Sequence, residues 1–501
     1  MRPVRFPLAL ILGFLGGLVA ADFGAAAPSP PTRRLEEGDS SGGTTASSRR
    51  NGFEAVYREA LSLLQAYLAA ESPNPPGKEA AAAEVLEDFL TREGIAVTKL
   101  EAVPGRPNLV AKVAGSGAGK PLILLQHLDV APPTPGRSAV TPGSVRDGAV
   151  WGAGAVDMKG LGTAQAVALA LLRRSGLSLA RDVWLVAAAD EEAGGRWGVE
   201  WLVVNRRELF RGAGLVLAEG GVNLVGPEGT PVFVGLEVRQ KVPLWLELKV
   251  HGPASHGALQ LRDAAGARLV RALHRVLTWR RRPRLLPEVE EFFHRLAEYQ
   301  EPRWREVFRE IEVHLEDPHF DVDTLGPYFG ALVQDTVNLT TLRSSDGPNV
   351  VPAEATAVLD CRLLWDRRPD DFLGELEAVI DDPAVEIRPV LRGEAAASKL
   401  PREAADAVLR ALLELGAEAA VGPAVQPGFT DARFFRRMGI PAVGFNPFPL
   451  GDVDGLSHAD GEHLPLDAFR FGLEWYVRTV AHLAGVDPEV LLQSGAAALR
   501  P

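Results

Sequence analysis

The sequence predicts an α/β protein in which helices cover both faces of a sheet. Residues 53–70 and 79–93 carry apolar residues at helical spacing, which is typical of amphipathic helices packed on a core. Residues 121–125 and 182–189 are short β-branched or apolar runs of the kind that form buried strands. The amphipathic segment 161–174 lies between those runs and is expected to be the crossover helix of a βαβ unit.

Size and charge limit what the protein can be. With 501 residues, the chain is long enough to bury a large core and to form more than one domain. Its formal net charge is −12, and acidic and basic residues are interspersed apart from one short arginine run. This distribution argues against a surface for phosphate groups, so nucleic acid is not an expected partner.

The first 50 residues are predicted to precede the folded part of the chain. Arg2 and Arg5 come before an apolar stretch over residues 6–21, and small residues follow it, as in an export signal. Residues 1–27 are therefore predicted to be a signal peptide of a secreted or periplasmic protein, with an uncleaved membrane anchor as the alternative. Residues 28–50 are rich in Pro, Ser, Gly, Thr and charge, which predicts a flexible leader. No later segment predicts a membrane span.

Cys361 is the only cysteine, so no disulfide can form within the chain. It lies in an alternating strand pattern, and no histidine adjoins it in a recognisable motif. A buried structural thiol is therefore favoured over a nucleophile.

Side chains that bind metals follow the predicted strands. His127 and Asp129 come directly after the first strand run, Glu191 and Glu192 after the second, and Glu219 after a third. Ligands of α/β sheets gather at the carboxyl ends of the strands, so these side chains are expected at one edge.

A glycine-rich segment, residues 151–160, adds a further carboxylate. Its glycines allow a tight backbone path that leads Asp157 toward the start of the crossover helix, facing the same edge. The segment is not a dinucleotide-binding fingerprint, because the third glycine and the acidic residue about 20 positions further on are not in place.

Each candidate has an ordinary structural explanation when taken alone. His127 and Asp129 could be a local hydrogen-bonded pair, and Glu191 with Glu192 could be a solvated helix start. Glu219 by itself indicates little. Together, however, several carboxylates in one cleft raise one another's pKa and cost stability unless cations neutralise them.

Imidazole and carboxylate ligands favour zinc, with manganese or cobalt as substitutes, and the lack of cysteine ligands argues against a closed structural site. A pair of ions can activate a water and polarise a carbonyl, but a base must still carry the proton to the leaving amine. Glu191 or Glu192 is the candidate for that base.

These motifs resemble those of the M20 family of metallopeptidases, most closely its carboxypeptidase S-like branch. The matching stretches, in family order, are residues 127–130, 152–160, 190–194, 217–221 and 457–462. They extend across most of the chain.

The resemblance implies a role for each matched residue. Asp157 would bridge two divalent metal ions, with Glu192 and His458 on one ion and His127 and Glu219 on the other. Glu191 would be the base. Asp129 would be the carboxylate that fixes the tautomer of a ligating histidine.

The resemblance also implies the domain organisation. A zinc-exopeptidase-like catalytic domain, with a mixed sheet flanked by helices, is expected from residues 51–231 and 366–501, and an inserted α+β lid domain from residues 232–365. A charged helical region at about 264–311 is expected to enlarge the lid. Because its bulk puts the family's lid-to-lid contact in doubt, the choice between a monomer and a homodimer stays open.

Three lid residues resemble substrate-binding positions. His256 matches a histidine that reaches a substrate or transition-state oxygen, often across a dimer interface. Asn349 and Arg362 match positions that hold a carbonyl and a terminal carboxylate. For Arg362 the alternative is a surface charge on a strand. Residues 427–431 resemble a turn beside the substrate pocket.

The expected function is hydrolysis of a peptide or amide bond in a small substrate, by an exopeptidase such as a carboxypeptidase or by an N-acyl amino acid amidohydrolase. A narrower deacylase or desuccinylase would share the fold. A non-catalytic binding protein on this scaffold would be marked by loss of a ligand or of the base, and the sequence shows no such loss.

Overall fold

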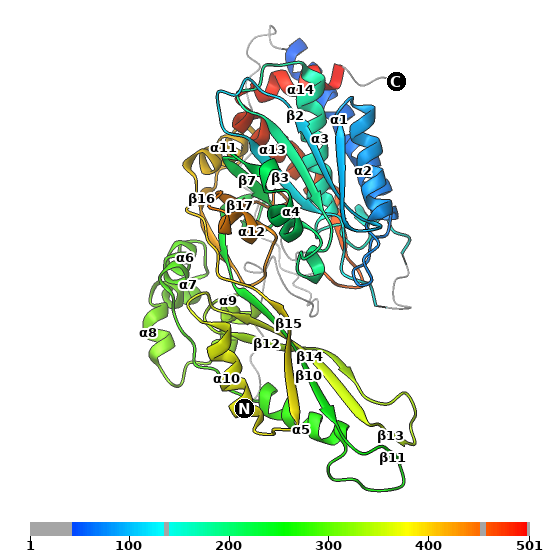
Figure 1. Cartoon of the computed structure of the whole chain (residues 1–501). Helices are drawn as coiled ribbons and strands as arrows, with labels where there is room; N and C mark the ends of the chain where they lie inside the picture. The colour runs from blue at the N-terminus through cyan, green and yellow to red at the C-terminus, as the bar shows by residue number, and fades with distance from the viewer. Residues whose placement is uncertain (1–42, 135–139, 451–456, 498–501) are drawn as a thin grey trace.

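The computed structural model describes residues 43–134, 140–450 and 457–497, which form a large unit and a smaller one built on separate sheets (Figure 1). The large sheet has nine strands within these residues. Their order is β1 (Val97–Val103), β2 (Arg106–Val113), β6 (Val183–Ala188), β3 (Leu122–His127), β7 (Leu215–Ala218), β17 (Ala442–Gly444), β9 (Pro231–Gln240) and β16 (Ala420–Gln426), with β8 (Val222–Val225) paired to β9. Parallel and antiparallel pairs both occur, so the predicted mixed sheet is confirmed.

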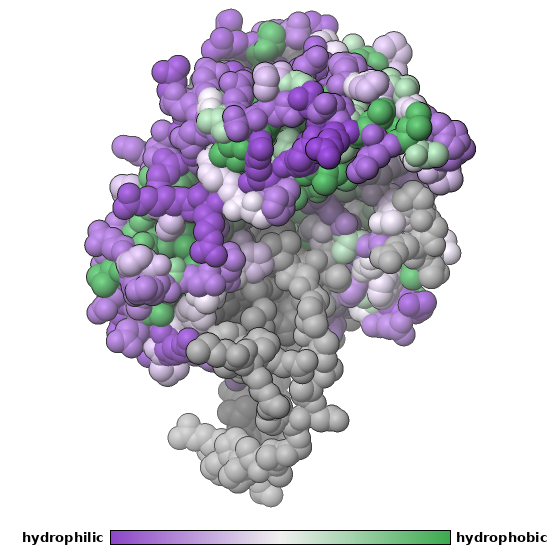
Figure 2. All heavy atoms as spheres, turned by 90° about the horizontal axis from the view of Figure 1, so that it is seen from below, coloured by the Kyte–Doolittle hydropathy of each residue, from purple (hydrophilic) through white to green (hydrophobic). Residues whose placement is uncertain are grey.

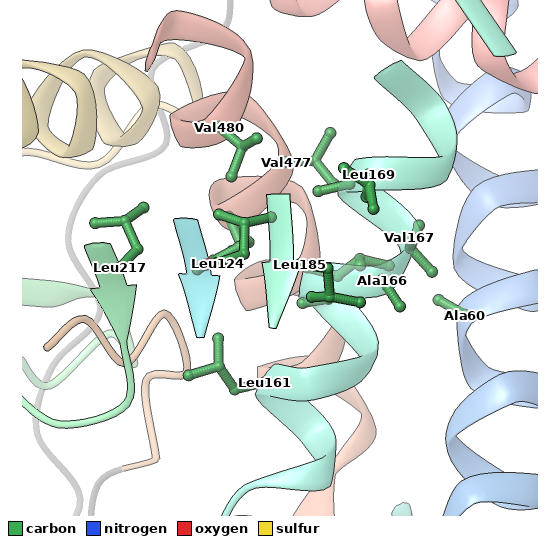
Figure 3. Close-up of a cluster of buried hydrophobic side chains, with 14 of the residues drawn as sticks. Ala60, Leu124, Leu161, Ala166, Val167, Leu169, Leu185, Leu217, Val477 and Val480 are labelled. Carbon is green, nitrogen blue, oxygen red and sulfur yellow. The ribbon is translucent and has the colours of Figure 1, made fainter. Parts of the chain in front are cut away.

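Helices cover both faces of this sheet. One face packs against α1 (Gly43–Ala69), α2 (Ala80–Arg92), α3 (Lys159–Ser175), α11 (Arg402–Glu414), α13 (Leu466–Ala484) and α14 (Pro488–Ala497), and the other against α4 (Val199–Asn205) and α12 (Ala432–Arg437). Successive strand side chains point to opposite faces, so Leu124 packs against the first set and Leu125 against the second. Figure 3 shows Leu124 and Leu185 facing Leu169 of α3 and Val480 of α13.

The predicted βαβ unit is present. β3 and β6 are parallel neighbours, and α3 connects them in the chain between Lys159 and Ser175. Every residue of β3 is buried, as expected for a strand covered on both faces.

The N-terminal prediction needs one correction. Helix α1 begins at Gly43, so residues 43–50, assigned to a flexible leader, are helical. Extending an existing helix needs no new nucleus, which explains why the polar composition of this stretch misled the prediction. The predicted signal peptide and residues 28–42 lie outside the described residues. Among the described helices, none has the length and apolar character needed to span a membrane.

The smaller unit is an antiparallel sheet with helices on one face. Its strands follow the order β12 (Thr336–Arg343), β14 (Glu354–Leu363), β10 (Val242–His251) and β15 (Val385–Arg392), and helices α5 (Ala265–Leu277) and α10 (Pro369–Ile380) cover it. Cys361 is buried beneath these helices, and burial raises the pKa of its thiol to about 12.

The predicted lid bounds, 232–365, therefore need correction. β9 belongs to the large sheet, because it pairs with β16 and β17. β10 pairs with β14 on one side and with β15 on the other, so the small sheet continues beyond residue 365. The strands of the lid therefore lie between about residue 242 and residue 392.

The charged helical region also differs from the prediction. Of the helices between β10 and β12, only α5 packs on the small sheet. The other four share a core with the β9–β16 edge of the large sheet: α6 (Pro287–Ala297), α7 (Pro302–Arg309), α8 (Ile311–Glu316) and α9 (Gly326–Leu332). Phe292 and Phe329 pack there with Phe233 and Val425. These helices therefore pack on the large sheet and not on the small sheet of the lid (Figure 1).

Seen from below, hydrophilic side chains cover most of the coloured surface, with apolar residues in patches between them (Figure 2). Single exposed apolar residues such as Val204 and Val313 are ordinary on a protein surface.

Candidate dinuclear metal site

The predicted ligands meet at one edge of the large sheet. His127 is the last residue of β3, and Glu219 directly follows β7. Glu191 and Glu192 lie in a 3₁₀ turn, η1 (Glu191–Ala193), just after β6. β3, β6 and β7 are parallel neighbours, so their carboxyl ends lie side by side.

Asp157 lies between two histidines. Its Oδ1 is 3.1 Å from Nε2 of His127, and its Oδ2 is 3.4 Å from Nε2 of His458. Asp157 precedes helix α3, whereas His458 comes from the loop after β17. Each carboxylate oxygen therefore faces a different imidazole, which is the arrangement a bridging ligand requires.

A glutamate lies near each histidine, so that each histidine, its glutamate and Asp157 form one set of possible metal ligands. Nε2 of His127 is 3.5 Å from Oε2 of Glu219, and Nε2 of His458 is 3.1 Å from Oε2 of Glu192. Two ligands of a tetrahedral zinc ion, each about 2.0–2.1 Å from the metal, lie about 3.3 Å apart. The observed separations match this value, so the donor sets fit two divalent ions that share Asp157.

The electrostatics of the site favour added positive charge. The pKa of His458 is raised to about 11 because its imidazole bonds to Asp157 and to Glu192. Burial opposes protonation of His127, but Glu219 and Asp157 outweigh it and raise the pKa of His127 well above its usual value. A metal ion in each set would supply the positive charge that these protons otherwise bring.

The two adjacent glutamates differ in their contacts. Glu192 faces His458 through Oε2, and its Oε1 accepts the N–H of Ala131 at 3.0 Å. Glu191 is 6% exposed, and its Oε1 has no hydrogen-bond partner among the described residues. Burial, followed by the charge of Glu219, raises the pKa of Glu191 well above its usual value. The geometry thus favours Glu191 over Glu192 as the proton carrier, a choice the residues alone left open.

Asp129 acts differently from the expectation. Nδ1 of His127 lies 2.9 Å from the main-chain carbonyl of Asp129 but 3.7 Å from its carboxylate. The carbonyl thus fixes the tautomer. The carboxylate accepts the N–H groups of Glu191 and Glu192 at 3.1 and 3.0 Å, so it positions the turn that carries both glutamates.

Asn74 supports the same turn and was missed in the sequence. Its Nδ2 donates to the carboxylates of Asp129 at 2.9 Å and Asp190 at 3.2 Å. Asn74 lies in a loop far from the other site residues in sequence, and no motif marks it.

A cleft of about 600 Å³ opens beside the ligands, between the large sheet and the lid. The lid contributes Trp245, Thr340, Val358, Asp360 and Arg362 to its lining. The guanidinium of Arg362 lies 4.4 Å from the ring of Phe429, and its Nε and Nη2 pair with Asp360 at 2.6 and 2.7 Å. Arg362 therefore faces the cleft, with Nη1 outside this ion pair.

His256 and Asn349 do not reach the cleft. His256 lies in β11 (Ser255–His256), which pairs with β13 (Val350–Val351) at the far tip of the lid (Figure 1). Both side chains are exposed, and neither lines the cleft. The long strands β10 and β14 carry this tip away from the metal ligands, so within one chain the predicted substrate contacts of these two residues are not formed.

Asp431, in the turn that follows β16, is a further buried acid near the site. It shares a small cavity with His127, Glu191 and Glu219, and neither of its carboxylate oxygens has a hydrogen-bond partner among the described residues. Burial raises its pKa to about 7. The resemblance marked this turn as lying beside the substrate pocket without giving Asp431 a role.

Asp431→Asn is expected to stabilise the metal-free protein at pH 8. A carboxyl whose pKa is raised from 3.8 to about 7 on folding stabilises the fold while protonated, and that stability is lost as the pH rises through 7. The amide cannot ionise, so the variant should gain up to roughly 4 kcal/mol over wild type at pH 8 and nothing near pH 4. Chemical denaturation across this range measures the difference, and a difference independent of pH would contradict the prediction.

The fold and the two ligand sets define a metal-dependent hydrolase, as the sequence predicted. The chain belongs to the peptidase family M20/M25/M40, whose family model matches residues 123–482. Aminoacylase-1B of Rattus norvegicus is 26% identical over 435 residues, covering 85% of this chain and 96% of that protein. The N-fatty-acyl-amino acid synthase/hydrolase PM20D1 of Xenopus tropicalis is 26% identical over 392 residues, covering 74% of each chain.

Solved structures confirm the fold. Human carnosine dipeptidase 1 superposes with a TM-score of 0.69 at 16% identity, covering 87% of this chain and 100% of that one. The M20 family metallo-carboxypeptidase Sso-CP2 of Sulfolobus solfataricus superposes with a TM-score of 0.59 at 19% identity, covering 88% and 99%. The predicted fold class, with its lid, and hydrolysis of a peptide or amide bond are confirmed at the level of the family.

Proposed function

We propose that this protein hydrolyses the amide bond of N-acyl amino acids with water as the nucleophile, and that its two ligand sets would hold divalent metal ions that activate this water. The observation that carries the proposal is the position of Asp157, with one carboxylate oxygen facing each imidazole–carboxylate set. Glu191 lies beside it, and its Oε1 has no hydrogen-bond partner among the described residues. The alignment of aminoacylase-1B over 85% of this chain supports the choice of substrate.

Zinc is the proposed metal, with cobalt or manganese as substitutes, because both sets combine imidazole with carboxylate. His127 and Glu219 would hold one ion, and His458 and Glu192 the other, with Asp157 shared. Bound ions supply Lewis acidity and lower the pKa of a water molecule.

Glu191 performs the proton transfers. Its carboxylate takes a proton from the attacking water and delivers it to the nitrogen of the leaving amine. Asp129 and Asn74 hold the turn that carries Glu191, so the base keeps its place relative to the metal ligands.

Arg362 is proposed to bind the substrate's carboxylate through Nη1, with Asp360 orienting its guanidinium. Arg362→Met should raise KM at least tenfold for an N-acyl amino acid, a loss of about 1.4 kcal/mol that fits one charge-assisted hydrogen bond. KM for the corresponding carboxamide should not change. Steady-state kinetics on the two substrates checks this, and an equal rise for both would show that Arg362 does not recognise the carboxylate.

The same site would also release the terminal residue of a dipeptide, because such a substrate has the same carboxylate next to the scissile amide. We place the protein in the carboxypeptidase S-like branch on its motifs at residues 127–130, 152–160 and 457–462. The N-terminal pattern supports export to the periplasm or the medium.

A homodimer is proposed as the active form. His256 and Asn349 are exposed at the lid tip, away from the cleft of their own chain, so they would contribute to catalysis only at the site of a second copy. Light scattering, together with the activity of His256→Ala, tests this: a monomer with a fully active variant would contradict it.

A substrate panel tests the proposed function. The zinc-loaded protein should release free amino acids from N-acetyl and longer N-acyl amino acids with kcat/KM at least tenfold above that for dipeptides with the same C-terminal residue. Glu191→Gln is the control for contaminating hydrolases. Preference for the dipeptides would make the protein an exopeptidase, and no release from any compound would contradict the proposal.

A further inference from the structure

We infer that Glu462 is a positioning residue of the metal site, holding Asp157 and His458 in a fixed relation. This inference rests on the proposed function, because it concerns the same metal ligands. Glu462 is 6% exposed, and its carboxylate accepts three backbone N–H groups. Oε1 accepts from Val156 at 2.8 Å and from Asp157 at 3.0 Å, and Oε2 accepts from Gly154 at 3.0 Å.

The main chain around Glu462 is attached to the same loop. Its carbonyl accepts the N–H of Gly152 at 3.1 Å, and its N–H donates to the carbonyl of Ala459, next to His458. His463 in β18 (His463–Pro465) pairs with Trp151 in β5 (Ala149–Trp151), and the centres of the two rings stack 4.3 Å apart. Hydrogen bonds and strand pairing thus connect the loop that carries Asp157 to the loop that carries His458, and Glu462 lies at this connection.

The connection between the two loops matters because the carboxylate ligands repel one another when no cation is present. Asp157, Glu192 and Glu219 are like charges gathered at one edge, and only loops hold Asp157 and His458 there. The buried carboxylate of Glu462 accepts the N–H of Asp157 and two more N–H groups just before it, and these bonds fix the backbone of Asp157 against that repulsion. Such outer contacts set the orientation of metal ligands, and their loss typically lowers metal affinity roughly 10- to 100-fold.

Binding of the two ions depends on this connection between the loops to different extents. His127 and Glu219 are fixed by the ends of the neighbouring strands β3 and β7. In their set, only Asp157 is therefore positioned by the connected loops. The set with Glu192 takes both Asp157 and His458 from the joined loops. A variant of Glu462 should therefore weaken the ion at His458 more than the ion at His127.

Zinc titration of the metal-free Glu462→Gln protein tests the inference without any substrate. Wild type should bind two ions; the variant should bind the first nearly as wild type does and the second roughly 10- to 100-fold more weakly. Asp335→Asn is the matched control, because Asp335 is also buried and accepts the N–H of Leu364 at 2.7 Å, but it lies at the base of the lid. This control should bind both ions normally.

A second readout separates positioning from a general loss of structure. Turnover by Glu462→Gln should recover toward the wild-type kcat when zinc exceeds the weaker dissociation constant, whereas Glu191→Gln should not recover. If the glutamine variant does not fold, Glu462→Asp, whose shorter side chain cannot reach all three N–H groups, should give the same order of affinities. Wild-type affinity for both ions, equal weakening of both, or no recovery at saturating zinc would overturn the inference. Because the titration uses no substrate, its result stands even if the proposed substrate is wrong.

Discussion

Glu191→Gln is expected to lower kcat roughly 10²- to 10⁴-fold while both metal ions stay bound. The amide has nearly the shape of the carboxylate but cannot accept the proton of the attacking water. Within the described part of the chain, no ion pair joins Glu191 to His127 or His458, so its replacement removes no ligand. KM should change little, because the loss falls on the transition state. Steady-state kinetics and elemental analysis on the same sample measure both effects.

The neighbouring residue provides the matched control. Glu192→Gln alters a ligand 3.1 Å from His458, so it should lower the metal content and should recover activity when zinc is added in excess. Added zinc should not restore activity to Glu191→Gln. If Glu191→Gln kept its turnover, Glu191 would not be the base; if it lost an ion, Glu191 would be a ligand instead.

Asp157→Ala is expected to abolish both metal binding and turnover. Asp157 is the one residue common to the two sets, so its removal takes a ligand from each ion and leaves the charges of the two histidines and glutamates without their bridge. Zinc at 100 times its dissociation constant should stabilise wild type by about 2.7 kcal/mol for each ion bound, and this gain should be absent from the variant. Thermal unfolding with and without zinc measures it.

Single-histidine variants serve as the comparison for Asp157→Ala. His127→Ala and His458→Ala should each lose one ion and still bind the other, because each histidine belongs to one set only. Normal binding of two ions by Asp157→Ala would reject its bridging role. Loss of a single ion would show that Asp157 belongs to one set alone.

The sequence was most informative where metal-binding or catalytic side chains come directly after a strand. His127, the glutamate pair and Glu219 each come after a buried apolar run, and parallel strands necessarily bring such positions to one edge. His458 could be placed only through the resemblance, because its loop lies far along the chain and no local pattern joins it to Asp157.

The lid was less predictable because antiparallel pairing depends on partners distant in sequence. β15 follows a helix and reads as a charged segment, yet it pairs with β10 across the sheet. Helices α6, α7 and α8 carry many charged residues, and the packing of α6–α9 with Phe233 and Val425 could not be inferred from periodicity alone.

Contacts that support the site were missed for a similar reason. Asn74 lies outside every matched stretch, whereas Glu462 lies in the matched stretch 457–462 but received no role there. Both act through hydrogen bonds to other residues' backbone or side chains, and such partners leave no spacing pattern in the sequence. Asp129 was found, but its carboxylate proved to hold the turn of Glu191 and Glu192, while its main-chain carbonyl bonds His127.

X-ray diffraction from zinc-loaded crystals at the zinc absorption edge tests the central claim most directly. Two anomalous peaks are predicted, one beside His127 and Glu219 and the other beside His458 and Glu192, each about 2.0–2.2 Å from a different carboxylate oxygen of Asp157. A single peak, or two peaks that do not share Asp157, would contradict the account.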